Sequence, residues 1–284
     1  NNRIPDEAMS KVSTVKELIV EMEKLVSGGE AQGQPISQVK PHASWNEILK
    51  EKPAEDIIKK LNIAPSRMAI LGTLLFIGSL RLAFRVVWRL KIFGTENIPR
   101  KKSCILCVNH GSYLDGFIVA ASMPRMLRND LFLVGFGGFF DHFFIRNVVK
   151  FIRVIPIDPG TRLMESMQAS SYVLENNKMV CIFPEGERTI DGKIQGFKKG
   201  VGILSKEMNV PLVPVYITGS YESWPRTRRF PRPYPIKITF GRPIEFEELK
   251  KVGLGLGAKD DYEAAALGIR EEIIKLKGNG KDAV

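Results

Sequence analysis

The stretch Cys104-Ile105-Leu106-Cys107-Val108-Asn109-His110 decides the fold. Its five apolar residues are followed at once by a polar pair, which is typical of a short strand that is buried on both faces. Apolar runs of the same kind recur at residues 179–183, 213–217 and 236–240. The chain therefore returns several times to the interior of one sheet.

Helical patterns separate these runs. They lie near residues 115–123, 162–175 and 200–208, and a last helix is expected over residues 260–276. Strands that alternate with helices pair as parallel neighbours and carry the helices on their faces. The sequence thus predicts an α/β fold with a mostly parallel central sheet flanked by helices.

Changes in composition predict four parts of the chain. Residues 1–26 carry a helical pattern, and residues 27–43 are polar and rich in Gly and Pro, as linkers are. Residues 44–92 are expected to be helical and to include a membrane-interface segment, and residues 93–284 to form the α/β domain. The first helix of the third part is expected over 44–64, with Ser44 and Glu47 as a capping box and Ile48, Ile57, Ile58 and Leu61 on its inner face.

Residues 68–80 form the most apolar run of the chain. A helix of this length covers roughly 20 Å, which is short of the roughly 30 Å of bilayer hydrocarbon. Arg81, Arg85 and Arg89 follow at helical spacing, opposite the apolar residues Leu82, Phe84, Val87 and Trp88. The pattern predicts a helix in a membrane interface with Trp88 at headgroup level, and a core helix or a tilted single span are the alternatives.

The charge of the chain indicates an anionic partner. Lys and Arg outnumber Asp and Glu by 42 to 31, for a net charge of +11. Nucleic acid, phospholipid headgroups and a phosphorylated substrate all satisfy this charge. Segment 224–232 holds four arginines among aromatic residues, and beside a lipid site it fits headgroups better than RNA.

The three cysteines give no disulfide framework. Cys104 and Cys107 have the spacing of a redox or zinc pair, yet they lie inside an apolar strand without a second pair. We therefore expect core cysteines and no metal site.

His110 and Asp115 are the first candidates for chemistry. A histidine directly after a strand lies where α/β sheets bind their ligands. If His110 stands in the turn before a helix and Asp115 in its first turns, the carboxylate can hold one ring nitrogen and leave the other free as a base. Such a pair can deprotonate a hydroxyl, although the spacing alone is common by chance.

A second polar segment follows the strand at 179–183. It reads Phe183-Pro184-Glu185-Gly186-Glu187-Arg188-Thr189, and Gly196-Phe197-Lys198-Lys199-Gly200 continues it. A glycine turn beside Arg188, Lys198 and Lys199, just before a helix N-terminus, predicts an anion site. A charged surface loop is the alternative.

Together these segments resemble the glycerophospholipid acyltransferase family, whose members acylate lysophosphatidic acid and related lysolipids. The resemblance covers roughly residues 93–248. Its blocks occur in the family's order: N-H-x4-D at 109–115, F-P-E-G-x-R at 183–188, F-K-x-G at 197–200, V-P-V at 213–215 and F-G-x-P-I at 240–244.

The resemblance implies acyl transfer from an acyl thioester to a lysoglycerophospholipid hydroxyl. His110 would be the general base and Asp115 would orient it. The residues implied in binding the acceptor are Asn109, Ser112, Glu185, Gly186, Arg188, Lys198 and Arg162. No tightly bound cofactor is expected, and acyl-CoA or an acyl carrier protein thioester would be the co-substrate.

One part of the family pattern is missing. The family carries an arginine after an I-x-V-D stretch that helps to bind the acceptor phosphate, whereas Pro159 and Gly160 follow Asp158 here. Arg162 and Arg153 are the two candidates to replace it. The departure leaves room for a lysophospholipid with a diester headgroup.

Residues 3–22 resemble the last helices of an acyl carrier protein. The match consists of Arg3-Ile4-Pro5-Asp6-Glu7 and a T-V-x-x-L helix at 14–18, without the phosphopantetheine-bearing serine motif. It implies that the chain is the C-terminal part of a larger protein whose carrier domain donates the acyl group in cis. An ordinary solvated helix is the alternative.

We therefore expect an O-acyltransferase of phospholipid biosynthesis, peripheral or monotopic on the cytoplasmic face of a membrane. Its expected partners are membrane phospholipids, the lysophospholipid acceptor and acyl carrier protein, and no nucleic acid is expected. A non-catalytic membrane-binding scaffold with the same fold is the alternative, but a scaffold does not need His110, Asp115, Glu185 and Arg188 together.

Overall fold

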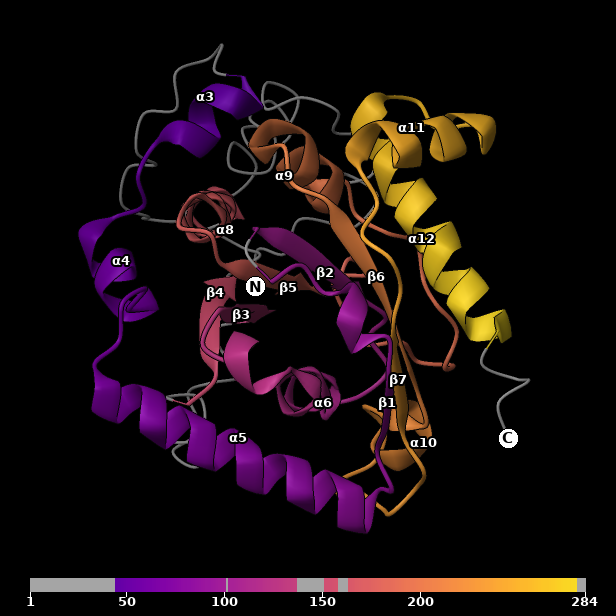
Figure 1. Ribbon diagram of the computed structural model, residues 1–284. Helices are drawn as coiled ribbons and strands as arrows, with labels where there is room; N and C mark the ends of the chain where they lie inside the picture. The colour runs from indigo at the N-terminus through magenta and orange to yellow at the C-terminus, as the bar shows by residue number, and fades with distance from the viewer. Residues whose placement is uncertain (1–43, 101, 137–150, 158–162, 280–284) are drawn as a thin grey trace, which may run out of the picture.

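A computed structural model describes residues 44–100, 102–136, 151–157 and 163–279 (Figure 1). Within these ranges one sheet has the strand order β1-β7-β6-β2-β5-β3-β4. The strands are β1 (Lys91–Phe93), β2 (Cys104–Val108), β3 (Leu131–Phe136), β4 (Arg153–Ile157), β5 (Met179–Ile182), β6 (Leu212–Thr218) and β7 (Lys237–Phe240). All neighbours pair in parallel except β6 and β7, which are antiparallel, so the mostly parallel sheet is confirmed.

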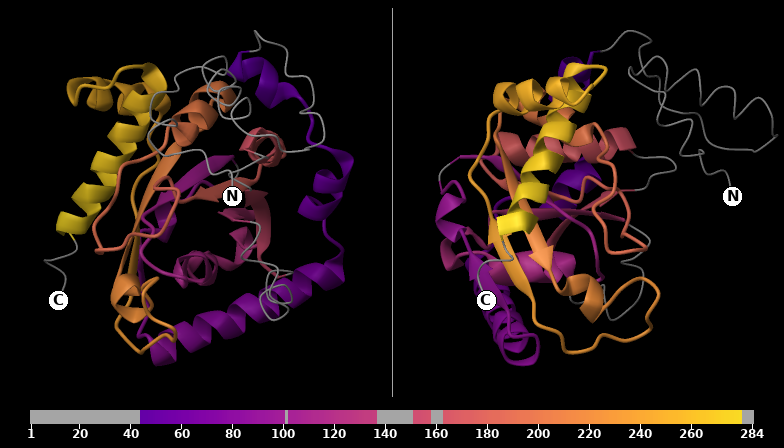
Figure 2. Two further views of the ribbon diagram at one scale, coloured as in Figure 1. Left: turned by 180° about the vertical axis from the view of Figure 1, so that it is seen from behind. Right: turned by 90° about the vertical axis from the view of Figure 1, so that its right-hand side faces the viewer.

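Helices cover both faces of this sheet (Figures 1 and 2). One face carries α3 (Trp45–Lys50), α4 (Glu55–Leu61), α8 (Leu163–Glu175), α9 (Gly200–Met208), α11 (Phe246–Gly255) and α12 (Asp261–Asn279). The other carries α6 (Asp115–Ser122) and, outside it, α5 (Arg67–Val87). A short helix, α10 (Ser220–Ser223), follows β6, and two 3-10 turns span Thr95–Asn97 and Arg125–Leu127. The four helices predicted downstream of residue 93 are thus present.

Strand β2 shows why this sequence needs two layers of helices. Side chains alternate along a strand, and here both sets are apolar. Ile105 and Cys107 belong to the core under α8 and α9, whereas Cys104, Leu106 and Val108 belong to the core under α6. The strand that carries the candidate histidine is therefore held from both sides.

The helix expected over 44–64 is two helices. Pro53 lies between α3 and α4, and proline both lacks the N–H that a helix interior requires and disfavours the helical conformation of the residue before it. The capping box is confirmed, because Ser44 Oγ accepts from Glu47 N at 3.3 Å and Glu47 Oε2 accepts from Ser44 N at 2.9 Å. Ile48, Ile57 and Leu61 are buried and Ile58 is half-buried.

Helix α5 is longer than the apolar run from which it was predicted. Its 21 residues make it the one helix in the described part of the chain that is long and apolar enough to cross a membrane. Its inner side nevertheless packs on the domain: Ile77 and Phe84 are buried, and the ring of Phe76 stacks on that of Phe151 at 5.0 Å. Along its outer side Met68, Leu71, Leu75, Leu82 and Val86 are 48 to 76% exposed. We call these five side chains the outer stripe.

The arginines of this segment are not arranged as predicted. Helix α5 ends at Val87, and Arg89 lies beyond it with φ of 49°, so it does not continue a helical stripe. Phe84 is buried, and Trp88 Nε1 donates to Ser223 Oγ at 2.6 Å and to Arg232 O at 3.0 Å. The Trp88 indole N–H thus bonds within the domain, and of the four predicted apolar side chains only Leu82 belongs to the outer stripe.

Candidate active site

The carboxyl ends of β2 and β5 bring the two predicted polar segments together. Cys107 of β2 is paired with Ile182 of β5, so His110 and Glu185 follow neighbouring strands at one edge of the sheet. The carboxyl ends of neighbouring parallel strands lie at the same edge of the sheet, and α/β proteins bind their ligands at this edge. The first of these segments leads directly into α6, whose first residue is Asp115.

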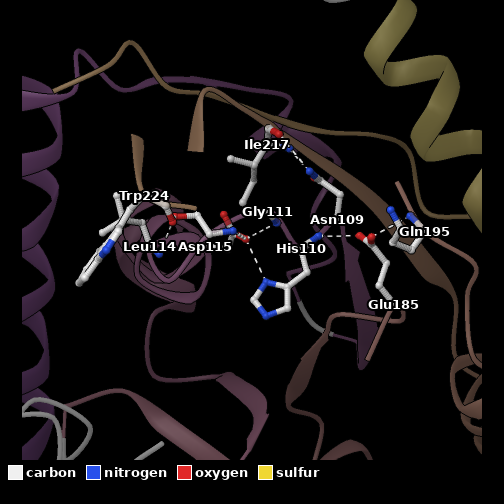
Figure 3. A network of polar contacts seen from close by, with 10 residues as sticks. Asn109, His110, Gly111, Leu114, Asp115, Glu185, Gln195, Ile217 and Trp224 are labelled. Carbon is white, nitrogen blue, oxygen red and sulfur yellow. Dashed lines mark hydrogen bonds and ion pairs between the residues drawn. The ribbon is translucent and has the colours of Figure 1, made fainter. Parts of the chain in front are cut away.

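Asp115 holds the ring of His110. Its Oδ2 lies 3.0 Å from His110 Nδ1 and also accepts the backbone N–H groups of Gly111 and Ser112, both at 2.7 Å (Figure 3). Asp115 is fully buried and His110 is partly exposed. Because a carboxylate only accepts hydrogen bonds, Nδ1 is the nitrogen that carries the proton. Figure 3 shows the second ring nitrogen pointing away from both carboxylates, which leaves its lone pair for chemistry.

The ring is also fixed from its face. It stacks on Phe183 with centroids 4.2 Å apart and planes 23° apart. Phe183 belongs to the segment after β5, so the two polar segments share one packed wall. An orienting carboxylate and a stacked ring together hold the histidine in one rotamer.

Glu185 lies behind the histidine. Its Oε1 accepts from the backbone N of His110 at 2.7 Å, and its Oε2 accepts from the backbone N of Gln195 at 2.8 Å. The side chain is buried, and this burial raises the pKa of Glu185 while the bonds from Gln195 and His110 lower it. Glu185 thus joins the loop after β2 to the loop after β5 and also braces that second loop internally through Gln195, which differs from the predicted contact with an acceptor.

Asn109 and Ser112 also have structural partners in place of the predicted acceptor. The Asn109 amide donates to Ile217 O at 3.1 Å and accepts from Ile217 N at 2.7 Å. Ser112 is fully buried, and its Oγ donates to Trp224 O at 2.8 Å and accepts from Leu114 N at 3.1 Å. Each of the two side chains thus donates one hydrogen bond and accepts another within the protein. Both residues therefore position the loop that holds His110.

Arg188 lies over the ring of Tyr113, with Cζ 3.5 Å from the ring centroid. It is half-buried, and this burial lowers the pKa of its guanidinium, although arginine stays charged at neutral pH. Tyr113 lies between His110 and Asp115 in the sequence, and the Asp115 carboxylate acts on the Arg188 guanidinium electrostatically, in the direction that raises its pKa. The sequence reasoning missed Tyr113, although its place inside the N-H-x4-D block was a usable signal.

The two lysines of the predicted anion site, Lys198 and Lys199, have different surroundings. Gly186 has φ of 81°, a conformation that favours glycine, and a Cβ there would lie 3.6 Å from Lys198 Cε. The Lys198 side chain therefore adjoins the glycine turn, as predicted. Lys199 Nζ instead bonds Asp260 at 2.6 Å and so belongs to the packing of α12.

The structure describes only one of the two candidates for the missing family arginine, Arg153. Arg153 begins β4 and is level with Phe132, Val180 and Ile105 across the sheet, so it lies towards the strand starts and cannot replace that arginine. Arg162 lies outside the described residues. So do residues 1–43, and with them the carrier-like segment and the linker.

A cavity of about 160 Å³ adjoins the backbone of His110 and Gly111. Glu185, Tyr216 and Tyr221 also line it. Sites for larger organic ligands run from about 300 Å³ upward, so this cavity has room only for a few water-sized groups.

The cysteines lie in the core, as predicted. Cys104 and Cys107 are buried and free, and so is Cys181. Among the residues that the structure describes, no group of three or more His, Cys, Asp or Glu side chains could hold a metal ion. The C-x-x-C spacing is thus a consequence of strand packing.

The fold and the site define an α/β protein with a histidine–carboxylate pair at the carboxyl edge of its sheet. Residues 89–218 match the model of the Acyltransferase family. The match begins just after α5 and ends with β6, and it includes His110, Asp115, Glu185 and Arg188.

Individual curated proteins also match part of the chain. The chain is 28% identical over 171 residues to a 1-acyl-sn-glycerol-3-phosphate acyltransferase of Limnanthes douglasii, covering 57% of this chain and 58% of that protein. It is 27% identical over 166 residues to the Pseudomonas aeruginosa enzyme of the same name, covering 56% and 60%. The chain thus spans about three fifths of the length of these two relatives.

A solved structure agrees in fold. The 1-acyl-sn-glycerophosphate acyltransferase PlsC of Thermotoga maritima superposes with a TM-score of 0.58 at 19% identity. The superposition covers 81% of this chain and 89% of that one. The predicted α/β architecture is therefore the architecture of a known acyltransferase.

Proposed function

We propose that this protein transfers an acyl group from an acyl thioester to the hydroxyl of a lysoglycerophospholipid, with 1-acylglycerol 3-phosphate as the acceptor. The observation that carries the proposal is the 3.0 Å contact between His110 Nδ1 and Asp115 Oδ2 within the acyltransferase-family region. The family supplies the reaction class, and this contact supplies the base that the reaction needs.

His110 Nε2 takes the proton of the acceptor hydroxyl as its oxygen attacks the thioester carbonyl. When the tetrahedral intermediate collapses, the C–S bond breaks and the imidazolium returns the proton to the sulfur. An alcohol and a thioester thus become an ester and a thiol, with no net proton uptake. Buried Asp115 stabilises the imidazolium, and a base in this position contributes about 10² to 10⁴ in rate.

Arg188 and Lys198 are proposed to bind the acceptor phosphate. Arg188 lies on the ring of Tyr113, a residue of the segment that carries His110, and Lys198 adjoins the Gly186 turn. Arginine offers a planar fork that matches phosphate oxygens, and lysine adds a second cation. A phosphate held there would bring the hydroxyl of the same glycerol near His110.

Helix α5 is proposed to hold the domain on the cytoplasmic face of a membrane. Its outer stripe is aliphatic, while Ile77 and Phe84 on its inner side are buried against the domain. A helix packed on its own domain cannot stand across a bilayer without immersing that domain, so it lies along the surface. Arg85 and Arg89 are exposed at its C-terminal end, where they can meet anionic headgroups.

The donor is proposed to be acyl carrier protein, with acyl-CoA as the alternative. The support is the resemblance of residues 3–22 to the end of a carrier domain. A flexible linker of about 17 residues has a reach of about 20 to 25 Å, which would keep a tethered thioester near the site.

The function is tested by measuring ester formation from 1-acylglycerol 3-phosphate with both thioesters of one fatty acid. We expect transfer by the wild-type protein and its loss in His110→Ala with vesicle binding unchanged. More than about a tenth of the activity in that variant would exclude His110 as the base. No transfer with either donor would favour the scaffold, and use of acyl-CoA alone would exclude the carrier as donor.

A further inference from the structure

The segment between α10 and β7, residues 224–235, is a long loop that the proposed reaction does not use. We call it the arginine loop. Phe230 is 67% exposed and Tyr234 is 39% exposed, so it presents two aromatic rings to its surroundings. Arg229 Cζ lies 5.3 Å from the centre of the Phe230 ring, and Arg232 Cζ lies 5.8 Å from that of Tyr234. No Asp or Glu occurs between Glu222 and Glu245.

The loop is held in shape by its own hydrogen bonds. Arg232 N donates to Ser223 O at 3.0 Å, and Arg232 Nε donates to Glu222 O at 2.8 Å. Trp224 Nε1 donates to Arg228 O at 3.0 Å. A surface that is already ordered loses little conformational entropy when it binds, so the exposed rings are ready for a partner.

The arginine loop is tied to the end of α5. Trp88, the residue after that helix, donates from Nε1 to both Ser223 and Arg232, and its carbonyl accepts from Ile236 N at 3.0 Å. Figures 1 and 2 show the loop beside the C-terminal end of α5, at the same side of the molecule. The aromatic and basic loop is thus fixed next to the C-terminal end of the helix that carries the outer stripe.

The outer stripe, the exposed aromatic rings and the arginines together indicate which class of partner binds here. An aliphatic stripe offers nothing to RNA, which is bound through phosphates and stacked bases. A protein partner would accept the apolar residues but does not require arginines without acidic neighbours. An anionic bilayer uses all three features, because apolar side chains enter the hydrocarbon, aromatic rings occupy the interface and each basic residue near the surface contributes about 1 kcal/mol.

We propose that the arginine loop is a second membrane contact, in which Phe230 enters the interface and Arg229 meets anionic headgroups. The inference rests on the proposed attachment through α5 and adds a second point, which fixes how the domain is rotated about that helix. Contact through the helix alone leaves the domain free to rotate about the helix axis. A second contact away from that axis prevents this rotation.

The loop also leads to the active site. Arg226 Nη1 bonds Glu187 Oε2 at 3.0 Å, and the ring of Trp224 lies 5.1 Å from that of Tyr113. Tyr113 in turn carries Arg188. Docking the loop therefore sets the height of the proposed phosphate site above the membrane.

The test is co-sedimentation of the full chain with phosphatidylcholine vesicles that contain or lack phosphatidylglycerol. The loop variant combines Phe230→Ser with Arg229→Glu. Its matched control combines Leu254→Ser with Lys251→Glu, which are exposed on α11 at the opposite side of the domain (Figure 1). A third variant changes Leu75 and Leu82 of the outer stripe to Ser, and melting curves confirm that all are folded.

We expect the loop variant to bind anionic vesicles at least about tenfold more weakly, since a reversed charge and a lost aromatic anchor act together. The α11 control should bind like wild type. Equal loss in the control, or no loss in the loop variant while the stripe variant fails, would overturn the second contact and leave the α5 proposal standing. A wild-type chain that ignores vesicles but sediments with RNA would overturn both.

Discussion

The carboxylate of Glu185 accepts the backbone N–H of His110 at 2.7 Å. Glu185 is therefore a positioning residue that acts on the proposed base through the main chain. Its second oxygen accepts the backbone N–H of Gln195, so one buried side chain joins the loop after β2 to the loop after β5. The resemblance to the family implied a contact with the acceptor, and the two alternatives make different kinetic predictions.

Glu185→Gln should lower kcat and leave the KM for the acceptor within about twofold. The amide has one acceptor oxygen, so one of the two N–H groups loses its partner at a cost of about 1 to 3 kcal/mol. A small shift of His110 then costs about tenfold to a hundredfold in rate. Steady-state kinetics decide the matter: a raised acceptor KM with unchanged kcat would mean that Glu185 binds the acceptor directly.

The same variant should change the pH dependence of stability. Burial raises the pKa of Glu185, so the native state holds this proton more tightly than the unfolded chain does. The stability that this group contributes is present below the ordinary carboxyl pKa and is lost as pH rises through the raised value. Melting temperatures across that window should therefore shift in favour of Glu185→Gln as pH rises, and the reverse trend would show that the native fold prefers the ionised form.

Arg188→Ala should remove the preference for a phosphorylated acceptor. Charge-assisted hydrogen bonds are worth about 1.5 to 3 kcal/mol, so kcat/KM for 1-acylglycerol 3-phosphate should fall about tenfold to a hundredfold. The rate with monoacylglycerol, which has no phosphate, should change little. Arg242→Ala is the matched control, because Arg242 is an exposed arginine paired with Glu248 on α11. If both acceptors lose equally, Arg188 supports the fold of the loop and does not bind phosphate.

The cysteines should not react in the folded protein. Burial raises the pKa of the Cys104 thiol to about 12 and moves those of Cys107 and Cys181 upward as well. The thiolate is the reactive form, so neutral iodoacetamide should leave activity intact and label all three sites only after unfolding. Mass spectrometry of the labelled protein checks this, and rapid native labelling of any of them would show that its strand opens.

Gly253→Ala should destabilise the protein without changing the chemistry. A Cβ at Gly253 would lie 1.9 Å from the carbonyl oxygen of Ala264, so α11 and α12 would have to separate. Such overpacking costs about 1 to 3 kcal/mol. Gly255→Ala, two residues on, meets nothing within 4 Å and serves as the control, which should melt at or above the wild-type temperature. Equal melting temperatures for the two variants would contradict the close packing.

The long apolar runs were sufficient to predict β2, β5, β6 and β7, whereas β1, β3 and β4 were not predicted. Strand β1 is only three residues long, Lys91–Phe93, and is held in the sheet by its parallel pairing with β7. Strand β4 contains Pro156, which usually argues against a strand and is tolerated here because β4 is at the sheet edge. In contrast, β3 carries an apolar run like that of β2 and could have been predicted from the same rule.

At the site, local spacing predicted His110 and Asp115 because five residues are enough to turn from a strand into a helix. Contacts between distant segments were not predictable in this way. Lys199 is bound by Asp260, which lies 61 residues further along the chain, and nothing in the loop sequence distinguishes it from Lys198. Likewise, the partner of the Glu185 carboxylate is a backbone group, which no pattern of side chains reveals.

The hydrogen bonds between Asn109 and Ile217 limit which residue can occupy position 109, directly before the histidine. The Asn109 amide replaces one rung of the sheet, since it gives Ile217 both the donor and the acceptor that β2 no longer provides after Val108. A replacement would have to offer both groups at this distance: aspartate has no donor, serine is too short and glutamine is one methylene too long. The identity of this residue is thus dictated by the neighbouring strand and not by the reaction, and the strand can release the histidine backbone to Glu185 without leaving a gap in the sheet.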